Sequence, residues 1–97
     1  MAKGYWIVSI DVSDADAYGD YQAFVRPFLA DNSGRFVVRG GQNEIVEGTG
    51  RARQVVVEFP SFEQARAAYW SEAYQSGMQK RLAASVADFV IVEGYDA

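Results

Sequence analysis

Alternating apolar and polar positions predict four β-strands in this chain. The predicted strands are Gly4–Val12, Arg35–Glu47, Gln54–Phe59 and Asp88–Tyr95. These runs are rich in β-branched and aromatic residues, which favour extended structure. In the first run, Trp6 and Val8 fall on a wholly apolar face, whereas Tyr5 and Ser9 fall on a mixed one. Because successive side chains of a strand point to opposite faces, this alternation predicts a sheet with at least one buried face.

Apolar residues at three- and four-residue spacing predict two helices between these strands. The first helix begins after a predicted N-cap at Ser13 and ends before Gly34. Pro27 lies inside it and is expected to cost about 3 kcal/mol or to kink the helix, because proline lacks a backbone donor. The second helix begins at Ser61 with a capping-box pattern and restarts at Ser71.

Two glycine motifs mark the second predicted strand. One lies inside the strand, and the other follows it, before the third strand. Gly40-Gly41 interrupts the second strand and predicts a β-bulge or a close approach by another backbone. Gly48-Thr49-Gly50 predicts a hairpin turn. Because this Gly-x-Gly motif opens a strand and not a helix, it aims no cluster of amides at a phosphate.

The order of these elements predicts the α+β class. We expect one domain over residues 1–97, a ferredoxin-like βαββαβ sandwich with an antiparallel four-stranded sheet and two helices on one face. The first and third strands are then central. Every strand carries apolar residues on both faces, as Trp6 and Ile7 do in the first. Since two helices cover only one face and an apolar sheet face has to be covered, we expect a homodimer.

Composition narrows the classes of partner. Of the 97 residues, 49% are hydrophobic and 23% charged, which is ordinary for a globular domain. The net charge of −4 argues against a nucleic-acid partner, which requires clustered cations. No apolar run approaches the roughly 20 residues of a membrane helix. We therefore expect a cytoplasmic protein with no nucleic-acid or membrane partner.

The chain contains no cysteine and no histidine. This excludes thiolate nucleophiles, zinc–sulfur sites, imidazole bases and histidine-bound metals. Asp14, Asp16 and Asp20 lie close together, but they fall in the first turns of the first predicted helix, where negative charge favours the helix dipole. We expect no metal and no cofactor.

Short motifs along nearly the whole chain carry a family resemblance, in order and with fitting spacings. They are KGYW at Lys3–Trp6, RGG at Arg39–Gly41, EG at Glu47–Gly48, EFPS at Glu58–Ser61, Tyr69, Ser71, YQ at Tyr74–Gln75, Arg81 and VEG at Val92–Gly94. In these motifs the sequence resembles the DUF1330 family. The resemblance implies a dimeric α/β barrel, in which two ferredoxin-like sheets pack face to face, and it implies no particular reaction. Trp70-Ser71-Glu72 departs from the small polar residue and proline that the family often has there.

Polar residues within apolar strands are the first candidates for a site. They are Ser9, Arg39 and Glu58. A one-residue bulge at Gly40-Gly41 would place Arg39 on the same face as Glu58, and two buried charges are expected to pair. Three readings remain for these residues. They form a structural salt bridge that fixes register or the dimer seam, the arginine holds an anionic or carbonyl oxygen beside a carboxylate base, or the residues are simply exposed at a strand end.

Tyrosines complete the candidate pocket. Its expected residues are Tyr5, Ser9, Arg39, Glu58, Tyr69 and Tyr74. In the last helix, Tyr74, Met78 and Leu82 form the predicted apolar stripe, which leaves Arg81 as a solvated residue or a partner of the helix dipole.

Two functions remain open at this point. The first is a homodimer that binds a small apolar, carbonyl or anionic ligand, with or without cofactor-free catalysis. The alternative is a non-catalytic dimeric module, structural or accessory to a stress response, without a ligand. An apolar cavity with an open mouth favours the first, and a close-packed interior favours the second.

Overall fold

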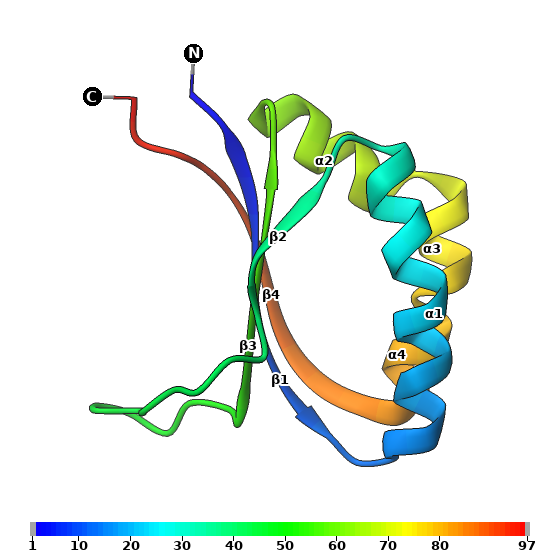
Figure 1. Ribbon diagram of the computed structural model, residues 1–97, viewed down its shortest axis with the longest axis vertical. Coiled ribbons are helices and arrows are strands. Elements are labelled where there is room, and N and C mark those ends of the chain that lie inside the picture. The colour runs from blue at the N-terminus through cyan, green and yellow to red at the C-terminus, as the bar shows by residue number, and fades with distance from the viewer. Residues whose placement is uncertain (1, 97) are drawn as a thin grey trace.

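In a computed structural model, which describes residues 2–96, one sheet carries all of the helices on one face (Figure 1). Its elements are β1 (Gly4–Val12), α1 (Ala15–Asp31), β2 (Arg35–Arg39), β3 (Arg53–Phe59), α2 (Phe62–Trp70), α3 (Glu72–Gly77), α4 (Gln79–Ala84) and β4 (Ser85–Glu93). No helix of the described residues is long and apolar enough to cross a membrane.

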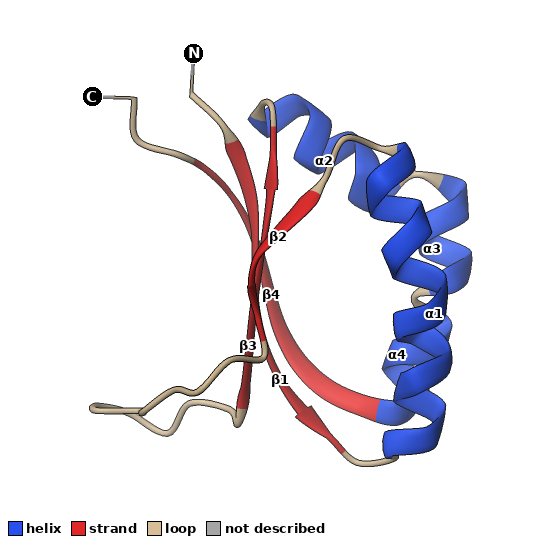
Figure 2. Cartoon of the chain, viewed as in Figure 1, coloured by secondary structure: helices blue, strands red, loops and turns tan. Residues whose placement is uncertain are grey.

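The strand order is β2-β3-β1-β4, and all neighbouring strands are antiparallel (Figure 2). The first and third strands are therefore central, as the sequence predicted, and the ferredoxin-like α+β fold is confirmed. The pairing of two such sheets is outside what one chain shows.

The core lies between the sheet and the helices, and Trp6 is at its centre. Its side chain is 1% exposed, and its indole Nε1 donates a hydrogen bond to the carbonyl oxygen of Ala65 on α2 at 2.8 Å. The indole ring packs against Phe59, Tyr74 and Phe89, with centroids at 5.1, 4.9 and 5.2 Å. Such aromatic contacts contribute more than the buried area alone. Through Trp6, the central strand is joined to α2, α3 and β4.

Local capping decides where the helices begin. α1 begins one residue later than predicted, because its N-cap is Asp14, whose side chain accepts a hydrogen bond from Ala17, and not Ser13. Ser61 caps α2 as predicted. Ser71 ends α2 and caps α3, so the predicted restart is confirmed, although the second helix is divided further into α3 and α4.

α1 continues through Pro27 to Asp31. The proline is exposed, whereas its neighbours Val25, Phe28 and Leu29 are buried against the sheet. The packing of these neighbours outweighs the lost hydrogen bond, since tertiary contacts routinely override local propensity.

β2 is shorter than predicted and carries its irregularity at a different place. It ends at Arg39, and the register shift lies between Phe36 and Val38, so the bulged residue is Val37 and not Gly40 or Gly41. Phe36 aligns with Val57 and therefore faces the helices. The bulge then returns Arg39 to the same face, opposite Val55.

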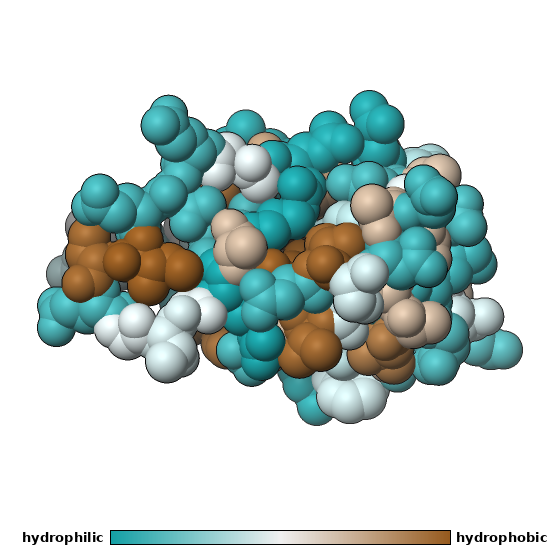
Figure 3. All heavy atoms as spheres, turned by 90° about the horizontal axis from the view of Figure 1, so that it is seen from below, coloured by the Kyte–Doolittle hydropathy of each residue, from teal (hydrophilic) through white to brown (hydrophobic). Residues whose placement is uncertain are grey.

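Residues 40–52 form a long projecting loop instead of a tight hairpin turn. The loop extends away from the helices, and its end carries an apolar patch (Figures 1 and 3). The exposed apolar residues of this loop are Ile45 and Val46. Its base is fixed by Arg51, which donates hydrogen bonds to Asp11 at 3.0 Å and to Asp88 at 3.1 Å.

The sheet face that carries no helix is partly apolar and partly charged. Its exposed apolar residues include Ile7, Val38, Val90 and Val92. At one end, the carboxylate of Glu58 accepts hydrogen bonds from Tyr5 and from Arg35, both at 2.9 Å. Arg35 and then Tyr5 hold the pKa of Glu58 below its ordinary value. The hydrogen bond between Tyr5 and Glu58 in turn raises the pKa of Tyr5.

Two glycine substitutions test the packing of the helices. Gly19→Ala lies within α1 with open space around the new methyl group, and should stabilise the protein by about 0.5–1 kcal/mol, since alanine is the better helix former. Gly77→Ala places its Cβ against the ring of Phe24, which stacks on Phe28, and should destabilise by about 1–3 kcal/mol. Urea unfolding of both variants gives the comparison. Equal effects of the same sign would contradict the packing described.

A second prediction concerns the carboxylate of Glu58. Because its folded-state pKa is lowered, its contribution to stability is present above the unfolded value of about 4.5 and is lost as the pH falls through the folded value. Glu58→Gln should therefore reduce stability at neutral pH and flatten the loss of stability on acidification below about pH 4.5. Urea unfolding across the acid range tests this, with Glu44→Gln in the exposed loop as the control. An unchanged acid profile for Glu58→Gln would overturn it.

Candidate functional site

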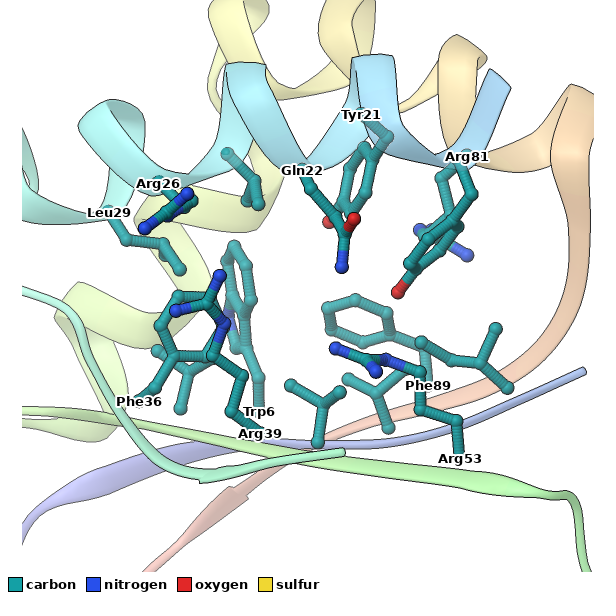
Figure 4. A pocket seen from close by; sticks show the side chains of 16 residues that line it. Trp6, Tyr21, Gln22, Arg26, Leu29, Phe36, Arg39, Arg53, Arg81 and Phe89 are labelled. Carbon is teal, nitrogen blue, oxygen red and sulfur yellow. The ribbon is translucent and has the colours of Figure 1, made fainter. Parts of the chain in front are cut away.

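A pocket lies between the sheet and the helices (Figure 4). Its walls come from β1, α1, β2, β3, α4 and β4. The lining residues are Trp6, Val8, Ile10, Tyr18, Tyr21, Gln22, Val25, Arg26, Leu29, Phe36, Arg39, Arg53, Val55, Val57, Arg81 and Phe89. Four of these are arginines and none is an aspartate or a glutamate. The site thus combines an apolar interior with a strong positive charge.

The pocket is open to solvent at one side. Its empty space is about 470 Å³ when counted out into the open mouth, and the centre of a water-sized molecule can move within about 30 Å³ of it. A volume of this size holds about two water molecules. The long side chains that border the mouth have to swing aside before a larger molecule enters.

Arg81, on α4, is the innermost of the four arginines. It is 4% exposed, and its Nε has no hydrogen-bond partner in the protein. The guanidinium lies over the rings of Phe89 at 5.3 Å and Tyr21 at 5.8 Å. Burial acts to lower the pKa of Arg81, but Tyr74 and Tyr21 more than offset this and the pKa is raised. Arg81 is therefore a charged group in the core, with no carboxylate beside it among the described residues.

Arg53 enters the same space from β3. It is half-buried, and its Nε also lacks a hydrogen-bond partner. The guanidinium lies 5.7 Å from the centroid of the Tyr18 ring on α1. It passes over Gly40, where a Cβ would collide with it and where the backbone φ is +67°. The positive φ is what favours a glycine at residue 40, since the flexible end of Arg53 can shift to relieve the contact.

Arg26 on α1 and Arg39 on β2 stand at the mouth. Both are exposed, and Arg39 lies over the Phe36 ring at 5.0 Å. No salt bridge to either of them occurs among residues 2–96. Arg35 and Arg51, which are paired with Glu58, Asp11 and Asp88, lie outside this pocket. All four arginines of the pocket thus lack a salt bridge among the described residues, whereas acidic residues neutralise Arg35 and Arg51.

Two phenol groups lie beside Arg81. The hydroxyls of Tyr21 and Tyr74 are 2.7 Å apart, and either can donate to the other. Burial raises the pKa of both groups, so each stays protonated at neutral pH. They can donate a hydrogen bond to an anion, but they do not serve as bases. Since no carboxylate lines the pocket, it stabilises negative charge but offers no group to accept a proton.

The predicted pairing of Arg39 with Glu58 is wrong. Because the bulge lies at Val37, Arg39 faces the helices, whereas Glu58 faces the other side of the sheet. Glu58 is paired with Arg35 instead. Tyr5 binds Glu58 on that same outer face, and Ser9, aligned with Gln54 and Asp88, lies there too. These three predicted residues do not line the pocket.

The other predicted tyrosines lie in the core behind the pocket. Tyr74 is fully buried and reaches the pocket only through the hydroxyl of Tyr21. Tyr69 is half-buried and packs edge-on against Trp6 at 6.3 Å. Of the six predicted residues, only Arg39 lines the pocket directly.

The prediction that Arg81 is solvated is also wrong. The buried positions of α3 and α4 are Tyr74, Gly77, Arg81 and Ala84, at spacings of three, four and three. The larger apolar side chains predicted a different buried face of this helix, but Leu82 is 50% exposed. The small residues Gly77 and Ala84, in phase with Tyr74, are the signal that would have placed Arg81 inside.

Metal binding has no support from the arrangement of side chains. Within residues 2–96, no three or more histidine, cysteine, aspartate or glutamate side chains come together as metal ligands would. Asp14 instead caps α1.

Several solved structures share this fold. A protein of unknown function from Rhodopseudomonas palustris, RPA0582, is 14% identical with a TM-score of 0.78, over 99% of this chain and 85% of that one. SnoaB from Streptomyces nogalater, a cofactor-independent oxygenase, is 13% identical with a TM-score of 0.66, over 100% of this chain and 97% of that one. A putative antibiotic biosynthesis monooxygenase from Nitrosomonas europaea is 14% identical with a TM-score of 0.59, over 97% of this chain and 92% of that one. At these identities the likeness establishes the fold alone.

The sequence itself gives the family. No curated protein matches it. The profile described as "Domain of unknown function (DUF1330)" matches residues 3–95, which is nearly the whole chain and includes the sheet, the helices and every residue that lines the pocket. The chain therefore belongs to the DUF1330 family.

Proposed function

We propose that this protein binds a small organic anion with an apolar body in the pocket between its sheet and its helices. The observation that carries the proposal is Arg81, a buried guanidinium that no carboxylate of the described residues neutralises. Burying an unpaired charge costs several kcal/mol, so it persists only where another gain compensates it. A bound anion supplies that gain.

The shape of the site supports an oxygen anion on an apolar body. The planar guanidinium of Arg81 matches a carboxylate, whose two oxygens accept two parallel hydrogen bonds. The hydroxyl of Tyr21 lies beside it, and the walls around both groups are apolar or aromatic, as in Val8, Val25 and Phe89. These walls exclude water, which strengthens every charge–charge interaction inside.

Catalysis is the second candidate function, and the fold shared with the cofactor-independent oxygenase SnoaB favours it. In this chain the pocket would hold a substrate oxyanion at Arg81 and Tyr21. Because no base lines the pocket, the substrate itself has to be acidic enough to ionise in water. We therefore place binding first and cofactor-free oxygenation second.

The alternative of a module without a ligand rests on the small free volume of the pocket. With all four arginine side chains in place, the centre of a water-sized molecule can move within only about 30 Å³. Flexible arginines at a solvent-open mouth move readily, however, whereas a close-packed core would not keep an unpaired cation at its centre.

Replacing Arg81 separates a binding role from a structural one. Arg81→Met should abolish binding of an anionic ligand, with a loss of about 100-fold or more, because the buried charge-assisted hydrogen bonds disappear. The same variant should keep its stability or gain up to about 2 kcal/mol, because it removes an unpaired buried charge. Native mass spectrometry of protein purified from its source, followed by thermal melting, measures both effects.

The matched controls are Arg66→Met, on the exposed side of α2, and Arg81→Lys. Arg66→Met should retain the ligand fully. Arg81→Lys keeps the charge but loses the planar pair of donors, so binding should weaken without vanishing. A strongly destabilised Arg81→Met protein that still carries the ligand would rule out the proposal.

We propose further that the protein is a homodimer that buries the outer face of the sheet. The apolar side chains of Ile7, Val38, Val90 and Val92 are exposed there at 40–54%. Neighbouring strands place Ile7 beside Val90, so these residues form one patch. Contiguous apolar patches of this kind favour a protein partner.

Sedimentation velocity tests the dimer. Val90→Glu introduces a charge into the patch and should weaken association by at least about tenfold, since a buried unpaired carboxylate costs more than 1.4 kcal/mol. Leu82→Glu, on an exposed position of α4, is the control and should leave association unchanged. A wild-type protein that sediments as a monomer at micromolar concentration would refute the dimer.

A further inference from the structure

The four arginines of the pocket form two groups, and each group has its own surroundings. In Figure 4, Arg53 and Arg81 lie toward one end of the pocket, and Arg26 and Arg39 lie toward the other. Arg53 lies over the ring of Tyr18, whereas Arg39 lies over the ring of Phe36. The two side chains start from positions on paired strands and still point to different rings. The positive charge is thus divided between two places.

The helix above the pocket shows the same separation. Tyr18 and Arg26 both come from α1 and both line the pocket. Eight residues separate them, which corresponds to about 12 Å along a helix. Between these ends, the lining is uncharged and mainly apolar, with Val25 on α1 and Val8 and Val55 on the sheet. An apolar floor therefore connects two cationic ends.

Neither end is neutralised by the protein. The Nε atoms of Arg53 and Arg81 are buried without hydrogen-bond partners. At the other end, no carboxylate among residues 2–96 forms an ion pair with Arg26 or Arg39. A single anionic group would satisfy one end and leave the other with two uncompensated like charges, which repel each other.

We infer that the ligand is a dianion: an elongated, mostly apolar molecule with an acidic group at each end. One acidic group lies between Arg53 and Arg81, beside the hydroxyl of Tyr21, and the second lies between Arg26 and Arg39. The inference rests on the proposed function and names its ligand class. It also gives the exposed arginines a role, since they hold the outer acidic group and close over the ligand.

Rigid aromatic diacids of three lengths are suitable probes. They are terephthalate, naphthalene-2,6-dicarboxylate and biphenyl-4,4′-dicarboxylate, each compared with its monomethyl ester by isothermal titration calorimetry at low ionic strength. The ester has nearly the same apolar body and one charge fewer. For at least one length, the diacid should bind about five- to tenfold more tightly than its ester, because the outer contacts are charge-assisted but partly exposed to solvent. The advantage should shrink at about 1 M salt.

The matched variants locate the second charge. The double variant Arg26→Gln with Arg39→Gln should bind the diacid and its ester equally, because the outer charge that distinguishes them has lost its partners. Arg66→Gln, whose position lies outside the pocket, should keep the full preference for the diacid. Arg81→Met should weaken the binding of the diacid and of the ester to a similar degree.

The outcomes distinguish the two proposals. The inference of a second acidic group is refuted if diacid and ester bind equally at all three lengths, or if the double variant keeps the preference for the diacid. In either case the proposed function, binding of an organic anion, still stands. If no probe binds and the protein retains no anion from its source in native mass spectrometry, the proposed function itself fails. A preference for one diacid that is lost in the double variant and kept in Arg66→Gln supports the inference.

Discussion

The contact between Trp6 and the helices divides the space above the sheet into two parts. On one side, Phe59, Tyr69 and Tyr74 pack around the indole ring and leave little room. On the other side, toward β2, the space is bordered by smaller apolar side chains such as Val8 and Val55 and by the rings of Tyr18, Tyr21 and Phe36, and the pocket lies there. The hydrogen bond from Trp6 to Ala65 fixes the distance between sheet and α2. The rigid half thus serves as the support that holds the open half apart.

Charge is sorted between the two faces of the sheet. On the outer face, Glu58 neutralises Arg35, and Asp11 and Asp88 neutralise Arg51. On the inner face, four arginines remain without carboxylates. The net charge of −4 therefore says little about the site, because a local field depends on where the charges lie. A pocket lined by arginines can therefore attract an anion even though the protein as a whole is acidic.

The sequence predicted the strands well and the site poorly, and the reasons are physical. Strand order and the Ser61 and Ser71 caps follow from local patterns, which involve residues close in sequence. The position of a bulge does not follow from local patterns, because it depends on the hydrogen-bonding register between β2 and β3. The glycine pair after Arg39 suggested the wrong residue. In the last helices, the large apolar residues Met78 and Leu82 suggested the buried face. The helices instead bury the face that carries the small residues Gly77 and Ala84, and Arg81 lies on that face.

The bulge at Val37 shows how one backbone irregularity assigns residues to a site. In a regular strand, Arg39 would alternate away from Phe36 and lie on the outer face of the sheet, as Glu58 does. The extra residue reverses this and places Arg39 on the inner face, over Phe36. The carboxylate of Glu58 is left to Arg35, and the guanidinium of Arg39 is left without a partner at the pocket mouth. An arginine without a carboxylate partner is available to an anionic ligand, and among the described residues Arg81 also lacks such a partner, at the other end of the pocket.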